Sequence, residues 1–117
     1  MKLADVEPEK NVAELIVRVV SVAPPRMIKT RYGKTTQLVE VLISDEPGSS
    51  AILSLWGYGV GGDLSAGKVM KIIDGWAKEW RGKIQLSLGK SGRYEILADD
   101  GSVPSITDLG SSTDSTV

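Results

Sequence analysis

Apolar and polar residues alternate along several runs of this sequence, with the period of β-strands rather than helices. The first run, residues 13–22, is apolar on both faces and is interrupted by Arg18. A strand of this kind indicates a curved barrel strand that is covered at both ends. Residues 35–44 alternate more cleanly, with Val39, Val41 and Ile43 on one face. We therefore expect both runs to be long strands of one barrel.

The next expected strand covers residues 51–56 and ends in a tryptophan. Ala51, Leu53 and Leu55 share the inward face, which leaves Trp56 on the opposite face with Ser54. Burial of Trp56 in the core is the alternative. Its place at the strand end, before a glycine-rich segment, favours exposure.

Residues 26–34 follow Pro24-Pro25 and predict a hairpin arm with its tip near Tyr32-Gly33. Its cations are Arg26, Lys29, Arg31 and Lys34. A solvated hairpin tip would account for them. We favour a ligand-binding loop, because a second basic segment with aromatic residues lies elsewhere in the chain.

That second segment, residues 71–88, predicts two strands joined by a hairpin. In an extended chain Trp76, Lys78 and Trp80 project from one face. Nucleobases stack on flat rings and phosphates are attracted to ammonium groups, so this row predicts a surface for single-stranded nucleic acid. Residues 68–93 hold seven lysines and arginines against two acids, so the net charge of −1 does not exclude a polyanionic partner.

The expected strands, including 69–76, 83–88 and 93–97, are those of an all-β protein. Their order and lengths predict an OB fold, a five-stranded Greek-key β-barrel whose second and third strands bind ligands. Residues 1–97 would form this domain, with Leu3 and Val6 holding the N-terminal arm to the body. Residues 98–117 contain four acids and no base, and we interpret them as a flexible, disordered tail.

Composition narrows the function further. The 117 residues include no cysteine and no histidine, which removes thiolate chemistry, the usual triads and the best zinc ligands. We therefore predict no catalytic site, no metal and no cofactor. The longest apolar run is broken by Arg18 and does not predict a membrane span, so a cytoplasmic, nucleoid-associated location is expected.

Two glycine-rich patterns resemble nucleotide-binding motifs. Residues 57–62 match GxGxxG, and residues 62–68 match GxxxxGK. Both motifs require a helix to follow at once, whereas residues 69–73 predict a strand, and Val69 stands where a hydroxyl should bind magnesium. We expect a connector across the barrel instead.

In order and spacing, these segments resemble a known family, the archaeal single-OB-fold single-stranded DNA-binding proteins, which are related to the eukaryotic sensor proteins of this kind. The resemblance covers roughly residues 3–97 and rests on VRVVSV, IKTRYGK, SDEPG, AILSLWG, LSAGKVMKI and GWAKEWRGKIQLSLG. It implies that the base-stacking aromatic residues are Trp56, Trp76 and Trp80, with contacts near Ile28 and Lys29. It also implies protection of single strands in replication, recombination and repair, with proteins of those processes as candidate partners.

The residues themselves point to the same mechanism, with cations attracting phosphates around the three rings. The expected cations are Lys29, Lys34, Lys71, Lys78, Arg81 and Lys83. We expect a monomer in isolation. An OB-fold subunit that binds another protein through the same rings is one alternative, and an RNA-binding module is another. Steep weakening by salt would separate nucleic acid from a protein partner.

Overall fold

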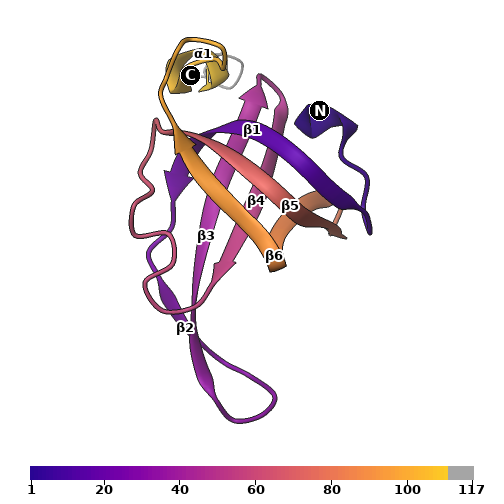
Figure 1. The fold of residues 1–117 in the computed structure, drawn as a ribbon, viewed down its shortest axis with the longest axis vertical. Helices are drawn as coiled ribbons and strands as arrows, with labels where there is room; N and C mark the ends of the chain where they lie inside the picture. Colours follow the sequence, from indigo (N-terminus) through magenta and orange to yellow (C-terminus); the bar gives the residue numbers. More distant parts are fainter. Residues whose placement is uncertain (111–117) are drawn as a thin grey trace.

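The strands form where the alternation predicts them, with differences at their ends. The computed structural model describes residues 1–110, except for the side chains of residues 89, 90 and 110; residues 111–117, the end of the predicted tail, lie outside the described part. The elements, shown in Figure 1, are η1 (Leu3–Asp5), β1 (Asn11–Val22), β2 (Arg26–Lys29), β3 (Thr35–Glu46), β4 (Ser49–Trp56), β5 (Val69–Trp80), β6 (Lys83–Leu97) and α1 (Ile106–Gly110).

Five of these strands close into a barrel. β1 pairs antiparallel with both β3 and β5, β5 pairs antiparallel with β6, β6 runs parallel to β4, and β4 pairs antiparallel with β3. β2 is an added arm that pairs with β3. β5 continues to Trp80 rather than ending at Trp76, and the two short strands predicted at 83–88 and 93–97 are one strand. The predicted five-stranded barrel is confirmed.

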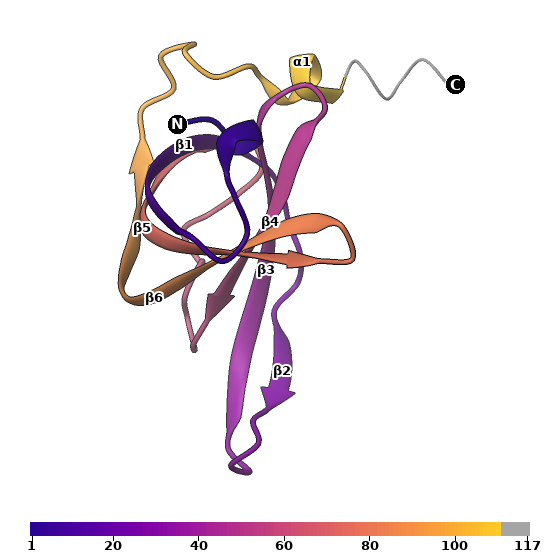
Figure 2. The ribbon, with the colours of Figure 1, turned by 90° about the vertical axis from the view of Figure 1, so that its right-hand side faces the viewer.

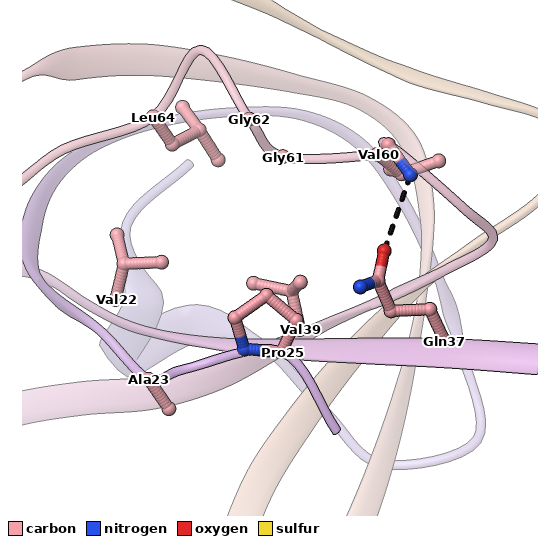
Figure 3. A pocket seen from close by; sticks show the side chains of 10 residues that line it. Val22, Ala23, Pro25, Gln37, Val39, Val60, Gly61, Gly62 and Leu64 are labelled. Atoms are coloured by element: carbon pink, nitrogen blue, oxygen red, sulfur yellow. Dashed lines mark hydrogen bonds between the residues drawn. The ribbon is translucent and has the colours of Figure 1, made fainter. Parts of the chain in front are cut away.

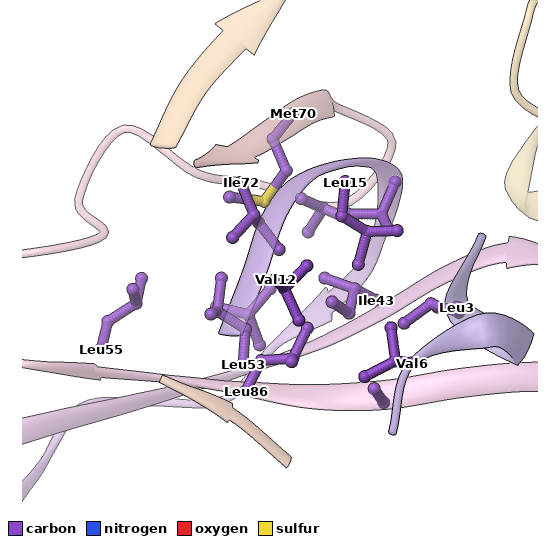
Figure 4. Close-up of a cluster of buried hydrophobic side chains, with 14 of the residues drawn as sticks. Leu3, Val6, Val12, Leu15, Ile43, Leu53, Leu55, Met70, Ile72 and Leu86 are labelled. Atoms are coloured by element: carbon purple, nitrogen blue, oxygen red, sulfur yellow. The ribbon is translucent and has the colours of Figure 1, made fainter. Parts of the chain in front are cut away.

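The barrel is filled by the inward residues of every long strand (Figure 4). Leu53 and Leu55 are fully buried as expected, and Leu3 and Val6 of the N-terminal arm pack on the same cluster. Burial of such side chains, at roughly 25 cal/mol per Å² of apolar surface, drives the closure of the barrel. The core therefore leaves the outward residues of the strands free for other roles.

Two hairpins project from the barrel in different directions (Figure 2). The β2–β3 hairpin extends well beyond one end of the barrel, and its tip lies near Tyr32-Gly33 as predicted, closed by a hydrogen bond from the Thr30 N–H to the Lys34 carbonyl at 2.7 Å. The β5–β6 hairpin extends sideways and carries Trp80 near its turn. These two hairpins carry most of the lysines and arginines that were predicted from the sequence to bind phosphates.

The segment 98–110 differs from the prediction of a flexible tail that starts at residue 98. It packs over the end of the barrel opposite the β2–β3 hairpin (Figures 1 and 2), where Val103 and Leu109 are buried. The physical cause is Arg18, which is itself buried and binds the carbonyls of Val103 and Pro104. The ordered body therefore extends beyond Leu97.

Residues 57–68 form the connector that the sequence predicted. All of them are described, and they consist of turns without a helix. The Gly67 N–H donates to the Val19 carbonyl at 2.8 Å, and the Val19 N–H donates to the Lys68 carbonyl at the same distance. The two glycine-rich patterns thus lack the helix that a nucleotide-binding motif needs. Among the described residues, no helix is both long and apolar enough to cross a membrane.

Candidate nucleic-acid interface

The outward face of β4, β6 and β5 carries the residues that the sequence selected. Trp76 is opposite Ser87 on β6, and Ser87 is opposite Ser54 on β4. Lys78, Gln85 and Ile52 form the next row in the same way. Paired residues on neighbouring strands project from the same side of a sheet. Between Trp56 and Trp76 the outward residues are the half-buried Ser54 and Ser87, whereas the exposed Lys78 lies between Trp76 and Trp80.

All three indoles are exposed. The exposed fraction is 50% for Trp56, 37% for Trp76 and 60% for Trp80, and Ala77 between the last two is fully buried. The alternative of a core Trp56 is therefore wrong. At the usual spacings of a sheet, Trp56 and Trp76 are roughly 12 Å apart and Trp76 and Trp80 roughly 13 Å. The predicted row of ring, ammonium group and ring is present, and Trp56 continues it diagonally.

A β-bulge at Asp74 decides which face the tryptophans occupy. Before the bulge, Met70 and Ile72 are buried; after it, the inward positions are Gly75 and Ala77, so the parity of the strand has changed. Asp74 adopts a positive φ of 55°, and Asn11 Nδ2 donates to its Oδ1 at 2.6 Å. Hydrogen bonds from Ser91 and then Asn11 lower the pKa of this carboxyl. Without the bulge, Trp76 and Trp80 would face the core.

We expect Asp74→Val to damage this face more than Asp74→Gly. Both variants lose the hydrogen bond to Asn11, but glycine adopts a positive φ freely, whereas a left-handed backbone costs an ordinary L-residue about 1–2 kcal/mol. Urea unfolding should give a lower midpoint for Asp74→Val than for Asp74→Gly. Equal midpoints would show that the strand does not depend on this conformation.

The β5–β6 turn fixes the outer end of the row. Arg81 and Gly82 have φ values of 53° and 79°, as a two-residue type I′ hairpin requires. The Arg81 guanidinium carbon lies 5.3 Å from the centroid of the Trp80 ring, within the range of a cation–π contact. Lys83 pairs directly with Trp80. Arg81 and Lys83 therefore place two positive charges beside one exposed ring.

The three hairpin residues selected by the sequence lie on different sides of the β2–β3 ribbon. Ile28 pairs with Thr36 and shares the face of Leu38, which pairs with Trp56, so Ile28 lies on the tryptophan side. Lys29 is the next residue and projects from the opposite face. Lys34 is exposed at the tip. The ribbon therefore presents an apolar side chain on the tryptophan side, one ammonium group on the opposite face and another at its tip.

Lys71 is the predicted cation that the structure separates from the rings. It lies on the part of β5 before the bulge, between Ile16 and Glu95, and its Nζ is 4.0 Å from a Glu14 carboxylate oxygen. Strict alternation would have placed Lys71 on the face opposite Lys78. The bulge turns both outward, so Lys71 is set apart by its distance along the strand and by its contact with Glu14.

The 57–68 connector borders a pocket of about 280 Å³ beside β3. Figure 3 shows Val22, Pro25, Val39 and Leu64 around it, with Gln37 at its edge, and none of its ten lining residues is charged. The connector is tied to β6 by Tyr94, whose hydroxyl donates to Asp63 at 2.6 Å. Burial, followed by the bond to Asp63, raises the pKa of Tyr94 to about 12. The pocket itself offers no charged side chain to a phosphate.

Comparison with solved structures identifies the fold. A replication factor A related protein from Methanobacterium thermoautotrophicum matches with a TM-score of 0.69 at 21% identity, over 83% of this chain and 89% of that one. The OB domain of Ta0387 from Thermoplasma acidophilum matches with a TM-score of 0.66 at 19% identity, over 89% and 90% of the two chains. The predicted OB fold is confirmed.

Sequence comparison gives the family, although no family model matches the chain. The "Single-stranded DNA binding protein Ssb" of Saccharolobus solfataricus is 30% identical over 100 residues, which is 86% of this chain and 66% of that protein. The chain is a homologue of that protein and belongs to its family, as the resemblance predicted. The chain spans about two thirds of this relative's length. The family is one of binding proteins, in agreement with the prediction that the chain is not an enzyme.

Proposed function

We propose that this protein binds single-stranded DNA with little sequence preference, by stacking bases on Trp56, Trp76 and Trp80. The observation that carries the proposal is the placement of three exposed indoles on one outward barrel face. Every base has a flat face, so stacking tolerates any sequence and contributes about 1–3 kcal/mol per base. The homology to a single-stranded DNA-binding protein supports the same conclusion. The role in the cell would be to cover single strands during replication, recombination and repair.

The backbone of the strand would be held by the cations beside the rings. Lys78 lies between Trp76 and Trp80, and Arg81 and Lys83 flank Trp80 at the turn. Lys29 and Lys34 of the β2–β3 hairpin would attract phosphates beyond Trp56, and Ile28 would contact a base or sugar. Arg81 covers one side of the Trp80 ring, so a base would either stack on the other side of that ring or displace the Arg81 side chain.

Titration of oligo(dT) while tryptophan emission is followed tests the proposal directly. We expect quenching and saturation, with affinity for single-stranded DNA well above that for duplex, whose bases are already stacked. If three to five phosphates are neutralised, the log–log dependence of affinity on salt should have a slope of about −2 to −3.5. Absence of binding at low salt would remove the proposal, and binding of oligo(dT) that is insensitive to salt would contradict the proposed phosphate contacts. Competition with single-stranded RNA shows which sugar is preferred.

Lys78 and Lys71 form a matched pair for the electrostatic part of this proposal. They lie on the same strand, but Lys78 is between two exposed rings, whereas Lys71 is beyond the bulge and beside Glu14. Lys78→Ala should reduce the magnitude of the salt slope by about 0.7, the value expected for one phosphate contact on a single strand. Lys71→Ala should leave it unchanged. The same slope for both variants would contradict the path of the backbone proposed here.

A further inference from the structure

Tyr58 is an exposed aromatic residue that the three-tryptophan site does not include. Its exposed fraction is 64%, and it comes two residues after Trp56 at the end of β4. The chain continues past Trp56 along the same edge of β3, because the Gly57 N–H donates to the Gln37 carbonyl at 2.8 Å. Tyr58 therefore lies on the line that leads from Trp56 toward the tip of the β2–β3 hairpin.

Hydrogen bonds hold this tyrosine in place although its ring faces solvent. Gln37 accepts hydrogen bonds from the N–H groups of the two glycines that flank Tyr58. The Gly57 N–H donates to the Gln37 backbone carbonyl, and the Gly59 N–H donates to Gln37 Oε1 at 3.2 Å. The Tyr58 hydroxyl donates to the Thr35 carbonyl at 3.1 Å. A ring that is already fixed loses little conformational entropy when a ligand stacks on it. Such an arrangement suits a contact surface.

The charge around Tyr58 indicates what would bind there. Residues 26–36 of the adjoining hairpin carry four cations and no acid, and Tyr32 at the tip is 82% exposed. Glu40 is the next acid along β3, and it is paired with Arg26 at 2.7 Å. A positively charged ribbon beside a fixed flat ring matches a polyanion that carries planar groups, rather than an apolar or basic peptide.

We propose that Tyr58 is a further base-stacking residue, so that the bound strand runs from Trp80 over Trp76 and Trp56 to Tyr58 and on toward the hairpin tip. This inference rests on the proposed single-stranded DNA binding and adds one end to its path. It assigns the phosphates of that end to Arg31 and Lys34 at the tip, while Lys29 on the opposite face of the ribbon adds only to the attraction at a distance. Ile28 lies on the tryptophan side of the same ribbon, where the strand would pass.

The test compares Tyr58→Ala, Tyr58→Phe and the control Ile16→Ala across oligo(dT) lengths of about 4 to 16 nucleotides, the range of site sizes of one OB fold. Ile16 is a partly exposed apolar residue on β1, away from the proposed path. Tyr58→Ala should weaken binding of the longer oligonucleotides by about fivefold or more and leave the shortest unchanged, with a smaller measured site size. Tyr58→Phe keeps the ring and should lose less. Ile16→Ala should change neither.

Unchanged affinity of Tyr58→Ala at every length would overturn the inference, and so would an equal loss at every length, because that would indicate a general structural effect. Urea midpoints of the variants show whether each is folded. If Tyr58→Ala does not fold, Tyr58→Phe provides the test. Its ring lacks the hydroxyl that anchors it, so its affinity for the longer oligonucleotides should fall while that for the shortest does not. This loss of affinity should be smaller than that of Trp56→Ala. Trp56→Ala in the same titrations tests the proposed function separately, since its loss should persist even if Tyr58 proves unimportant.

Discussion

Replacing Trp56, Trp76 and Trp80 together with alanine should abolish measurable binding of oligo(dT) while the barrel stays folded. Each ring is expected to contribute about 1–3 kcal/mol, which corresponds to a loss of roughly 5-fold to 150-fold in affinity per substitution. The rings are more than about 10 Å apart, a separation at which effects usually add. The triple variant should therefore bind at least a hundredfold more weakly than the wild type.

Single substitutions show whether the loss comes from stacking. Trp→Phe at each position keeps a smaller ring and should therefore lose less affinity than Trp→Ala at the same position. Ile16→Ala removes a partly exposed apolar side chain elsewhere on the barrel and serves as the control. Urea midpoints near that of the wild type would establish that the fold is intact. Full affinity of a folded triple variant would contradict the role of the three rings.

The barrel could be predicted from sequence because its strands alternate strictly over long runs. Leu53 and Leu55 turn inward and Trp56 outward, as the period of two requires. The spacing of Trp76 and Trp80 likewise gave their common face correctly, because it used only the residues after the bulge. Extended back to Met70, the same alternation would have placed both rings inside.

The bulge at Asp74 and its consequences could not be predicted from the alternation of apolar and polar residues. Aspartate is among the residues that tolerate a positive φ, but it also occurs on exposed strand positions, so its type alone does not predict a bulge. Strict alternation places Lys71 and Lys78 on opposite faces, whereas the change of parity at the bulge turns both outward. The position of the bulge is set by partners that are distant in sequence, among them Asn11.

The packed C-terminal segment was missed for a different reason. Its composition is that of a solvated tail, yet Ser105 and Asp108 have the spacing of a helix N-cap, and the Ser105 hydroxyl does accept from the Asp108 N–H at 3.2 Å. Val103, Ile106 and Leu109 recur every three residues, which is a helical period. These two signals together would have favoured a short helix. The decisive contact, with Arg18, lies more than 80 residues away and has no local signature.

We expect Arg18→Ala to destabilise the protein by about 3 kcal/mol and to release the segment 98–110 from the barrel. Only 3% of Arg18 is exposed, and its five N–H groups are all used: toward the carbonyls of Gly67, Val103 and Pro104, and twice toward the Asp99 carboxylate. Alanine would leave three partly buried carbonyls without their donor. That is a large fraction of the 5–15 kcal/mol that stabilises a typical domain.

Urea unfolding measures this loss, and limited proteolysis within 98–110 reports whether the segment detaches. Affinity for oligo(dT) serves as the control. Arg18 binds the segment 98–110, which packs over the end of the barrel opposite the β2–β3 hairpin (Figure 1), so its variant should bind normally while folded. A midpoint equal to that of the wild type, with no new cleavage, would mean that the segment is held by its apolar residues alone.

The same contact should make stability depend on pH in the acid range. The hydrogen bond from Arg18, followed by the Gly101 N–H, lowers the pKa of Asp99 below its ordinary 3.8. A carboxyl whose pKa is lower in the folded state stabilises the protein fully above its unfolded pKa, and this contribution disappears as pH falls through the folded pKa. Asp99→Asn should therefore lower the urea midpoint at pH 7, and its difference from the wild type should shrink once the pH falls below 3.8. Arg18 keeps its three carbonyl partners in that variant, so the loss of stability at pH 7 should be smaller than that of Arg18→Ala. The reverse order would mean that the Asp99 carboxylate, rather than the three carbonyls, is the main partner that holds the segment.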